Sequence, residues 1–163
     1  MINMIAAVSN NAIIGLEGIL PWQGKYTEDM KFFREKTKGA TVIMGRATYQ
    51  SIGKALPKRR NIVISSISKQ EGLLANEADI EVFNSLPAAL ETCSEDVWLI
   101  GGESIYTEGM KHADNIYLTL IPEFVDIQYK KHAKFPFVNP KLFPKQSSQM
   151  ISDVLEVITY SKN

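Results

Sequence analysis

The chain has 163 residues, in which 18 lysines and arginines balance 18 aspartates and glutamates. Zero net charge supplies no general field for nucleic acid or an anionic membrane, so we expect neither as a partner. One cysteine excludes an intrachain disulfide, and with only two histidines beside it we expect no bound metal. The absence of a signal peptide and of apolar runs near the roughly 18 residues of a membrane span favours a cytoplasmic protein with a single domain over residues 1–163.

Short apolar runs predict strands, and helical spacing between them predicts helices. Thr27 and Ser85 are the candidate helix caps, and Pro87 fits the first turn of the helix that Ser85 begins. In chain order, strands are expected at 2–8, 41–45, 61–65, 80–83, 97–100 and 115–121, and helices at 27–36, 46–52, 85–93 and 101–110.

Residues 9–24 and 124–160 depart from this alternation. The first segment holds three glycines and a proline without a clear period, which is typical of a functional loop. The second contains no convincing helix, only strand-like pieces such as 154–160. The whole pattern predicts an α/β fold, a three-layer sandwich. Its central sheet is mixed and mostly parallel, with about eight strands, antiparallel C-terminal strands and about four flanking helices.

Ligands of such sheets bind beyond the carboxyl ends of the parallel strands. Gly101-Gly102 and Gly45-Arg46 each join a predicted strand to a predicted helix. Glycines let a phosphate approach the backbone, the helix start favours its charge, and a guanidinium can pair with it. Each could instead be an ordinary turn or a solvated arginine, but two such junctions in one sheet favour a nucleotide site.

The ends of the second and third strands bear on the choice of nucleotide. Ser65 and Ser66 either add hydroxyl bonds to a phosphate or merely end a strand. NAD usually meets an acidic residue at the ribose, whereas NADP requires positive charge. No acidic residue follows the second predicted strand, and Arg46 lies there instead, which favours NADP.

Asp29 is the acid of interest, in the first turn of the helix at 27–36. It could simply compensate the helix dipole, as Glu28 could. If it faces a pocket lined by Phe33 and Ile52, desolvation raises its pKa and it would bind a flat N–C–N donor edge. Arg59 lies in a basic cluster that is typical either of a solvated turn or of the partner of a carboxylate tail.

Taken together, these pieces resemble dihydrofolate reductase. The similarity covers the chain to about residue 122 and, more loosely, the tail. The order and spacing of the matching stretches carry it: Ile5-Ala6-Ala7, Ile14-Gly15, Leu20-Pro21-Trp22, Asp29-Met30-Lys31-Phe32-Phe33, Val42-Ile43-Met44-Gly45-Arg46, Thr48-Tyr49, Ser51-Ile52-Gly53, Leu56-Pro57, Arg59-Arg60-Asn61, Ile100-Gly101-Gly102, Tyr106 and Tyr117-Leu118-Thr119.

The resemblance implies roles toward the substrate. Asp29 would grip the pterin edge together with Thr119 and a water, and Arg59 would pair with the glutamate tail of folate. The catalytic group would be Asp29, Trp22, Leu20 and Thr119. Substrate contacts would come from Ile5, Ala6, Asp29, Met30, Phe33, Ile52, Leu56, Arg59, Ile100, Tyr106 and Thr119.

The cofactor that the resemblance implies is NADPH. Residues 16–24 would form the mobile loop that closes over the nicotinamide. The peptide bond between the paired glycines would be cis. Cofactor contacts would come from Ala7, Ile14, Gly15, Gly45, Arg46, Ala47, Thr48, Ser65, Ser66, Gly101, Gly102, Glu103, Ser104, Ile105 and Tyr106.

The implied activity is reduction of 7,8-dihydrofolate by a monomer, with antifolates as possible inhibitors. A pyrimidine reductase of riboflavin synthesis, a non-catalytic folate- or NADPH-binding relative and an α/β interaction domain stay as alternatives. The chain departs from the family pattern at several places. Two residues are inserted between Trp22 and Asp29, affecting Lys25-Tyr26. Glu103-Ser104 replaces a glycine and a base, and residues 126–134 look longer and more basic.

Overall fold

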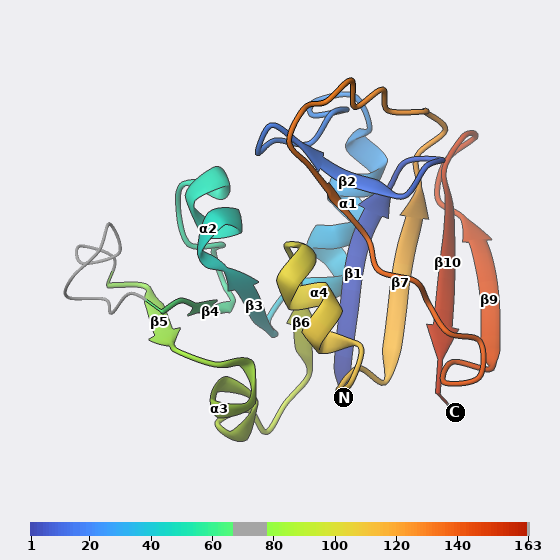
Figure 1. Ribbon diagram of the computed structural model, residues 1–163. Coiled ribbons are helices and arrows are strands. Elements are labelled where there is room, and N and C mark those ends of the chain that lie inside the picture. The colour runs from blue at the N-terminus through green and yellow to red at the C-terminus, as the bar shows by residue number, and fades with distance from the viewer. Residues whose placement is uncertain (67–77, 163) are drawn as a thin grey trace.

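The computed structural model describes residues 1–66 and 78–162 (Figure 1). Its helices are α1 (Thr27–Thr37), α2 (Arg46–Ile52), α3 (Leu86–Glu91) and α4 (Glu103–Gly109). Its strands are β1 (Ile2–Val8), β2 (Ile13–Leu16), β3 (Thr41–Gly45), β4 (Arg60–Ile64), β5 (Ile80–Phe83), β6 (Val97–Leu99), β7 (Asn115–Leu120), β8 (His132–Lys134), β9 (Lys145–Met150) and β10 (Glu156–Ser161).

Eight strands form one sheet in the order β5-β4-β3-β6-β1-β7-β10-β9. The six strands from β5 to β7 are parallel, while β10 is antiparallel to β7 and β9 is antiparallel to β10. Helix α1 lies behind this sheet in Figure 1, and α4 lies in front of it. The predicted α/β sandwich with antiparallel C-terminal strands is therefore confirmed.

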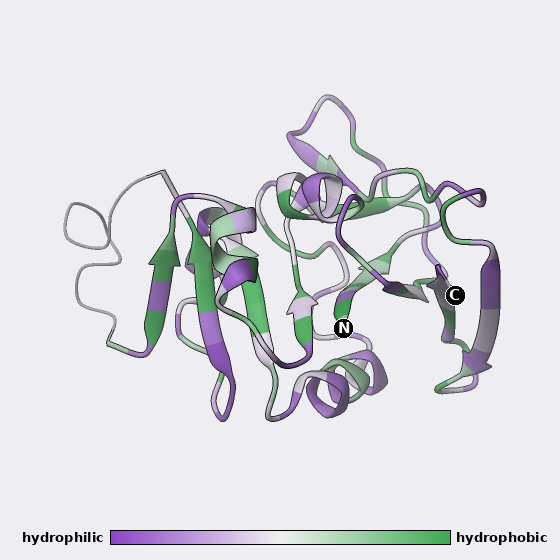
Figure 2. Ribbon diagram, turned by 90° about the horizontal axis from the view of Figure 1, so that it is seen from below, coloured by the Kyte–Doolittle hydropathy of each residue, from purple (hydrophilic) through white to green (hydrophobic). Residues whose placement is uncertain are grey.

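The central strands are apolar on both faces because helices cover both. In β3, Ile43 belongs to the core cluster that contains residues of α3 and α4, whereas Val42 and Met44 belong to the cluster that contains Phe32 of α1. All three β3 side chains are fully buried. This period-two division explains why hydrophobic residues predominate along the central parallel strands (Figure 2).

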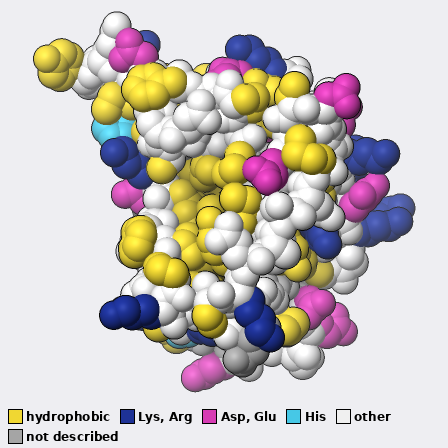
Figure 3. Space-filling model, turned by 90° about the vertical axis from the view of Figure 1, so that its right-hand side faces the viewer, with side chains coloured by type: hydrophobic (Ala, Val, Ile, Leu, Met, Phe, Trp, Pro, Cys, Tyr) yellow, Lys and Arg dark blue, Asp and Glu magenta, His cyan; other side chains and the backbone are white. Residues whose placement is uncertain are grey.

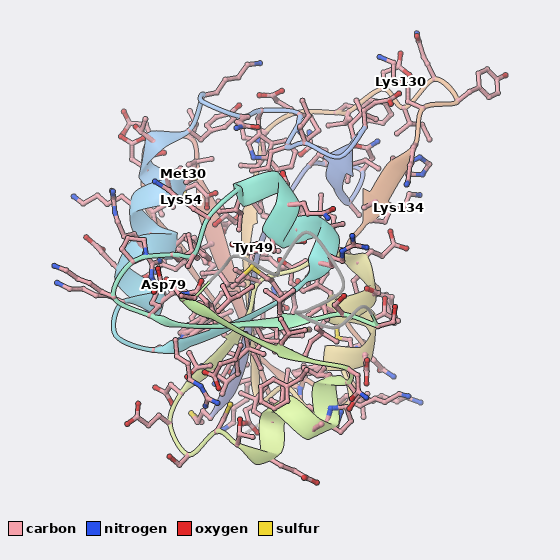
Figure 4. All side chains as sticks on the ribbon, turned by 90° about the vertical axis from the view of Figure 1, so that its left-hand side faces the viewer. Met30, Tyr49, Lys54, Asp79, Lys130 and Lys134 are labelled. Atoms are coloured by element: carbon pink, nitrogen blue, oxygen red, sulfur yellow. The ribbon has the colours of Figure 1, made fainter. Side chains whose placement is uncertain are left out.

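A second, two-stranded sheet formed by β2 and β8 lies at the end of the molecule that the carboxyl ends of β1 and β7 reach (Figure 1). Leu16 pairs with His132. Lys130 and Lys134, labelled in Figure 4, lie on the segment before β8 and on β8 itself. The prediction of residues 9–24 as a loop without strands is thus wrong for residues 13–16, since pairing with a distant polar segment orders them.

The two predicted helix caps have different outcomes. Ser85 caps α3, where its side chain accepts a hydrogen bond from the backbone of Ala88. Thr27 is not the cap of α1, because Tyr26 occupies that position and the Thr27 hydroxyl donates to Glu28 instead.

At the other side of the molecule all six residues of edge strand β9 are exposed. Figure 3 faces this side and shows hydrophobic side chains in a hollow, with charged side chains mostly around it.

Candidate functional site

The two predicted strand-to-helix junctions meet at the carboxyl ends of β3 and β6. The backbone N–H of Gly45 donates to the carbonyl of Gly101 over 2.8 Å, and the Gly101-Gly102 peptide bond is cis. A Cβ added at Gly102 would lie 3.5 Å from Oγ1 of Thr48 on α2. The starts of α2 and α4 therefore lie close together, and the glycines allow this close approach.

Polar groups with unmet hydrogen-bonding capacity lie at this junction. Arg46, the first residue of α2, is half-buried, and its buried Nε has no hydrogen-bond partner among the residues that the structure describes. Gly102 caps α4 without a side-chain hydrogen bond to the helix. A buried guanidinium N–H without a protein partner is suited to a phosphate group. The residues at this junction fit a dinucleotide cofactor.

Other predicted cofactor residues are placed differently. The carboxylate of Glu103 accepts a hydrogen bond from the backbone N–H of Lys134, 2.6 Å away, and therefore ties α4 to β8. Gly15 lies against Ala133, because a Cβ added at Gly15 would be 3.7 Å from the Cβ of Ala133. Ile105 and Ser65 are buried, whereas Ala47, Ser66 and Ser104 are exposed, and Ala7 and Ile14 are half-buried. The roles of these residues toward a cofactor stay predictions.

Asp29 lies in the first turn of α1 and is partly buried. Burial raises the pKa of its carboxyl above the ordinary value of 3.8, and a hydrogen bond with Thr119 of β7 opposes that rise. A residue that only compensated the helix dipole would lie in solvent, without such a partner. The structure therefore favours the desolvated acid over the alternative of simple dipole compensation.

The predicted apolar walls divide into two groups. Ile5, Phe33, Leu56 and Ile100 belong to or pack against one core cluster, which also includes Phe32 of α1 and Tyr49 of α2. Figure 4 views the side where α1 and α2 are both visible, with Met30 and Tyr49 labelled. Leu20, Met30 and Ile52 are at least one-third exposed, which is how side chains at the mouth of a site would lie. Ala6 packs against the other core cluster.

Tyr106 connects the two halves of the site. Its buried hydroxyl donates to the carbonyl of Ile5 over 2.7 Å, and a Cβ added at Gly101 would lie 3.1 Å from that hydroxyl. Burial raises the pKa of the Tyr106 phenol, and the negative charge of Asp29 raises it further. The charge of Asp29 on α1 therefore acts on the residue that packs against the Gly101 backbone.

Arg59 is held at the rim of α1. Its Nη1 donates to Oγ1 of buried Thr37 over 2.9 Å, and its Nε donates to the carbonyl of Pro57 over 2.9 Å. Partial burial lowers the pKa of the Arg59 guanidinium, and the nearby charge of Arg34 lowers it further. Two guanidinium groups that repel one another form a corner where an anion would be stabilised, which agrees with the predicted carboxylate partner.

The loop between β2 and α1 is attached to the body at several points. Trp22 is buried among Ile13, Ile121 and neighbouring apolar residues, and its indole N–H has no partner among the described residues. The Ser51 hydroxyl of α2 donates to the Gly18 carbonyl over 3.3 Å. Trp22 therefore anchors this loop by packing against the body, and its free N–H still permits a polar contact.

Sequence reasoning missed one group of contacts altogether. The phenol of Tyr26 donates to Oε2 of Glu123 over 2.6 Å, and Nζ of Lys25 lies 3.7 Å from Oε1 of the same carboxylate. The only sequence signal was the two-residue insertion before Asp29. Nothing local indicated its partner, which is 97 residues away from Tyr26.

Neither metal-ligand clusters nor membrane-spanning helices occur in the part of the chain that the structure describes. Within residues 1–66 and 78–162, no three or more histidine, cysteine, aspartate or glutamate side chains are grouped so that they could hold a metal ion. None of the helices in these two ranges combines the length and the hydropathy needed to cross a bilayer.

Known proteins share both the sequence pattern and the fold. The chain is 37% identical to the type 3 dihydrofolate reductase of Salmonella typhimurium over 138 residues, covering 83% of this chain and 78% of that protein. It is 39% identical to the dihydrofolate reductase of Buchnera aphidicola subsp. Acyrthosiphon pisum over 145 residues, covering 88% and 82%.

A solved structure extends the similarity to the fold. The dihydrofolate reductase of Enterococcus faecalis, complexed with NADP(H) and RAB-propyl, superposes with a TM-score of 0.82 at 26% identity, covering 100% of this chain and 96% of that one. The family profile described as dihydrofolate reductase matches residues 1–161. The chain therefore belongs to the dihydrofolate reductase family.

Proposed function

We propose that the site between Asp29 and the Gly101-Gly102 pair reduces a pterin ring. The chain is a dihydrofolate reductase, which uses NADPH to convert 7,8-dihydrofolate to 5,6,7,8-tetrahydrofolate. One observation carries the assignment of the site. The half-buried carboxyl of Asp29, with its raised pKa and its bond to Thr119, lies close enough to Tyr106 for its charge to act there.

Asp29 binds the substrate through its shape and charge. A carboxylate presents two acceptor oxygens in one plane, which match two parallel N–H donors on the edge of a pterin. Thr119 would orient this carboxylate through their hydrogen bond. The cluster that contains Ile5, Phe33 and Ile100 would cover the ring faces and exclude water. Arg59 would hold the carboxylate tail, which fixes the ring along its long axis.

The cofactor end supplies different chemistry. NADPH, when bound, provides the hydride that is added at C6 of the substrate. The buried Nε of Arg46, which has no hydrogen-bond partner among the described residues, would hold the 2′-phosphate, and the backbone of Gly101-Gly102 at the start of α4 would lie against the pyrophosphate. The close approach of Gly45 to Gly101 keeps side chains out of this space. These residues therefore align the two reactants, and alignment is the main contribution that the protein makes.

The proton that N5 gains has a separate route. Asp29 would bind the far edge of the pterin, so it does not hand over this proton itself. We assign the immediate donor to a water molecule, with Asp29 stabilising the polarised ring. Trp22 is buried in the adjacent loop with its indole N–H free of described partners, so it can hold such a water in place.

A substrate comparison tests this function. NADPH oxidation should proceed with dihydrofolate and should not proceed with the pyrimidine substrate of riboflavin synthesis. Replacing NADPH by NADH should lower the rate strongly, because NADH lacks the 2′-phosphate that the Arg46 guanidinium would hold. No turnover of dihydrofolate would remove the proposed function, whereas equal rates with both cofactors would remove only the role of Arg46.

We also propose that the chain acts as a monomer in the cytoplasm and that antifolates compete with dihydrofolate at Asp29. A single cysteine, Cys93, is consistent with a reducing compartment. Sedimentation at micromolar concentration tests the monomer, and competition between dihydrofolate and a 2,4-diaminopyrimidine tests the shared site.

A further inference from the structure

The segment that joins the closing loop to α1 is bound to the segment after β7 by a short hydrogen bond. The phenol of Tyr26 donates to Oε2 of Glu123 at 2.6 Å, within the range of a charge-assisted O–H···O⁻ bond. The bond raises the pKa of the Tyr26 phenol, together with burial and the charge of Glu123. Nζ of Lys25 adds an exposed ion pair at 3.7 Å, which contributes little by itself.

Glu123 is a fixed anchor rather than a mobile surface acid. Its backbone N–H donates to the carbonyl of Ile121 over 2.8 Å, and its own carbonyl accepts a hydrogen bond from the backbone of Asn10 over 2.8 Å. Two residues later, the backbone of Val125 is bonded in both directions to the side chain of Asn11. The carboxylate therefore starts from a backbone position that its own turn and the segment at residues 10–11 hold in place.

Tyr26 transmits that position to the catalytic helix. It is the N-terminal cap residue of α1, and its carbonyl accepts hydrogen bonds from Asp29 over 3.2 Å and from Met30 over 3.5 Å. Its ring packs against the cluster that contains Trp22 and Ile121. Because Tyr26 lacks a side chain that can cap the helix, the bond to Glu123 takes over the task of fixing this helix end.

Two contacts thus link the same pair of segments. The Thr119 hydroxyl acts on the Asp29 carboxyl, and Tyr26, three residues earlier, is hydrogen-bonded to Glu123, four residues after Thr119. We infer that Tyr26 and Glu123 are positioning residues that set the angle of the Asp29 carboxyl toward the pterin. The inserted pair before Asp29 lengthens the connection to α1, and this clamp restores its rigidity. The inference rests on the role proposed above for Asp29.

Four variants of the full chain test the clamp. Tyr26→Phe and Glu123→Ala each remove the bond, Glu123→Gln keeps an acceptor, and the double variant completes a thermodynamic cycle. Glu81→Ala is the matched control, because it breaks another 2.6 Å contact of a partly exposed carboxylate, with Arg60 at the far side of the sheet. Steady-state kinetics with each reactant varied, together with thermal unfolding, are measured for every variant.

Tyr26→Phe and Glu123→Ala should each raise KM for dihydrofolate by roughly three- to tenfold and leave KM for NADPH within about twofold. The double variant should resemble either single variant, and Glu123→Gln should recover most of the loss. Glu81→Ala should change thermal stability only. Additive effects of the two changes, or equal losses toward NADPH and dihydrofolate, would overturn the clamp.

The kinetics distinguish failure of the clamp from failure of the proposed role of Asp29. If Asp29→Asn leaves the kinetics toward dihydrofolate unchanged, the proposed role of Asp29 fails, and the clamp fails with it. If Asp29→Asn impairs dihydrofolate binding while Tyr26→Phe and Glu123→Ala do not, only the clamp fails. Should Glu123→Ala not fold, Tyr26→Phe still decides, since it removes only one hydroxyl.

Discussion

Replacing Asp29 by asparagine tests the charge at the centre of the site while keeping its shape. The amide retains one acceptor oxygen and replaces the other by a donor, so one of two hydrogen bonds to the pterin edge is lost. A hydrogen bond to a charged group contributes about 1.5–3 kcal/mol. At 1.36 kcal/mol per factor of ten, kcat/KM for dihydrofolate should fall roughly 10- to 150-fold at neutral pH.

The size of this loss should depend on pH. Burial raises the pKa of Asp29 above 3.8, so the carboxyl becomes protonated in the wild type at less acidic pH than an exposed aspartate does. Above that raised pKa the wild type has the carboxylate and the variant does not, so the loss is largest. In acid the Asp29 carboxyl of the wild type is uncharged as well, and the substrate is protonated more readily without the carboxylate, so the loss is smaller.

The assay is NADPH oxidation with dihydrofolate over a range of pH, with wild type and Asp29→Asn measured side by side. The ratio of their kcat/KM values should fall steadily toward acid pH. A ratio that stays constant across this range would show that Asp29 acts through packing or shape alone, and the reasoning from its charge would be refuted.

Four further outcomes are expected. Between pH 3.8 and the raised pKa of Asp29, the folded chain binds more protons at this residue than the unfolded chain does. The free energy of unfolding therefore falls as pH rises through this range. Asp29→Asn should raise Tm at neutral pH but not below pH 3.8. Arg46→Ala should raise KM for NADPH but not for NADH. Arg59→Ala should raise KM for dihydrofolate but not for a pterin that lacks the glutamate tail. Gly109→Ala places a Cβ 2.5 Å from Cδ1 of Leu99, and calorimetry should show a loss of about 1–3 kcal/mol with kinetic constants near wild type.

The buried half of the fold could be predicted because burial leaves a sequence signal. β3 was predicted with the bounds that the structure has, since a helix-covered parallel strand is apolar on both faces. β5 was also predicted with its bounds, although it is an edge strand with an exposed Glu81, because Ile80, Val82 and Phe83 mark it. β8 and β9 could not be predicted. All six side chains of β9 are exposed, and the three of β8 include a histidine and a lysine. An edge strand that buries neither face follows no apolar pattern, and only its partner strand identifies it.

The residues of the candidate site likewise divide into those that the sequence indicates and those that it does not. Gly45, Gly101 and Asp29 stood out in the sequence because their chemistry needs those residue types beside a strand end or a helix start. Tyr26 and Glu123 carried no such signal, since a tyrosine and a glutamate are ordinary surface residues. Their pairing follows from where β7 ends relative to the start of α1, which is a property of the folded chain only.

The placement of Asp29 conflicts with stability and thereby indicates selection for another purpose. A carboxyl whose pKa is raised by burial destabilises the fold whenever it is ionised, and a neutral side chain of the same size would not. The hydrogen bond from Thr119 offsets part of that cost, while the bond between Tyr26 and Glu123 holds the helix end in place. A fold maintained only for stability has no need to hold an ionised acid away from water, so this arrangement is expected where the charge must meet a ligand.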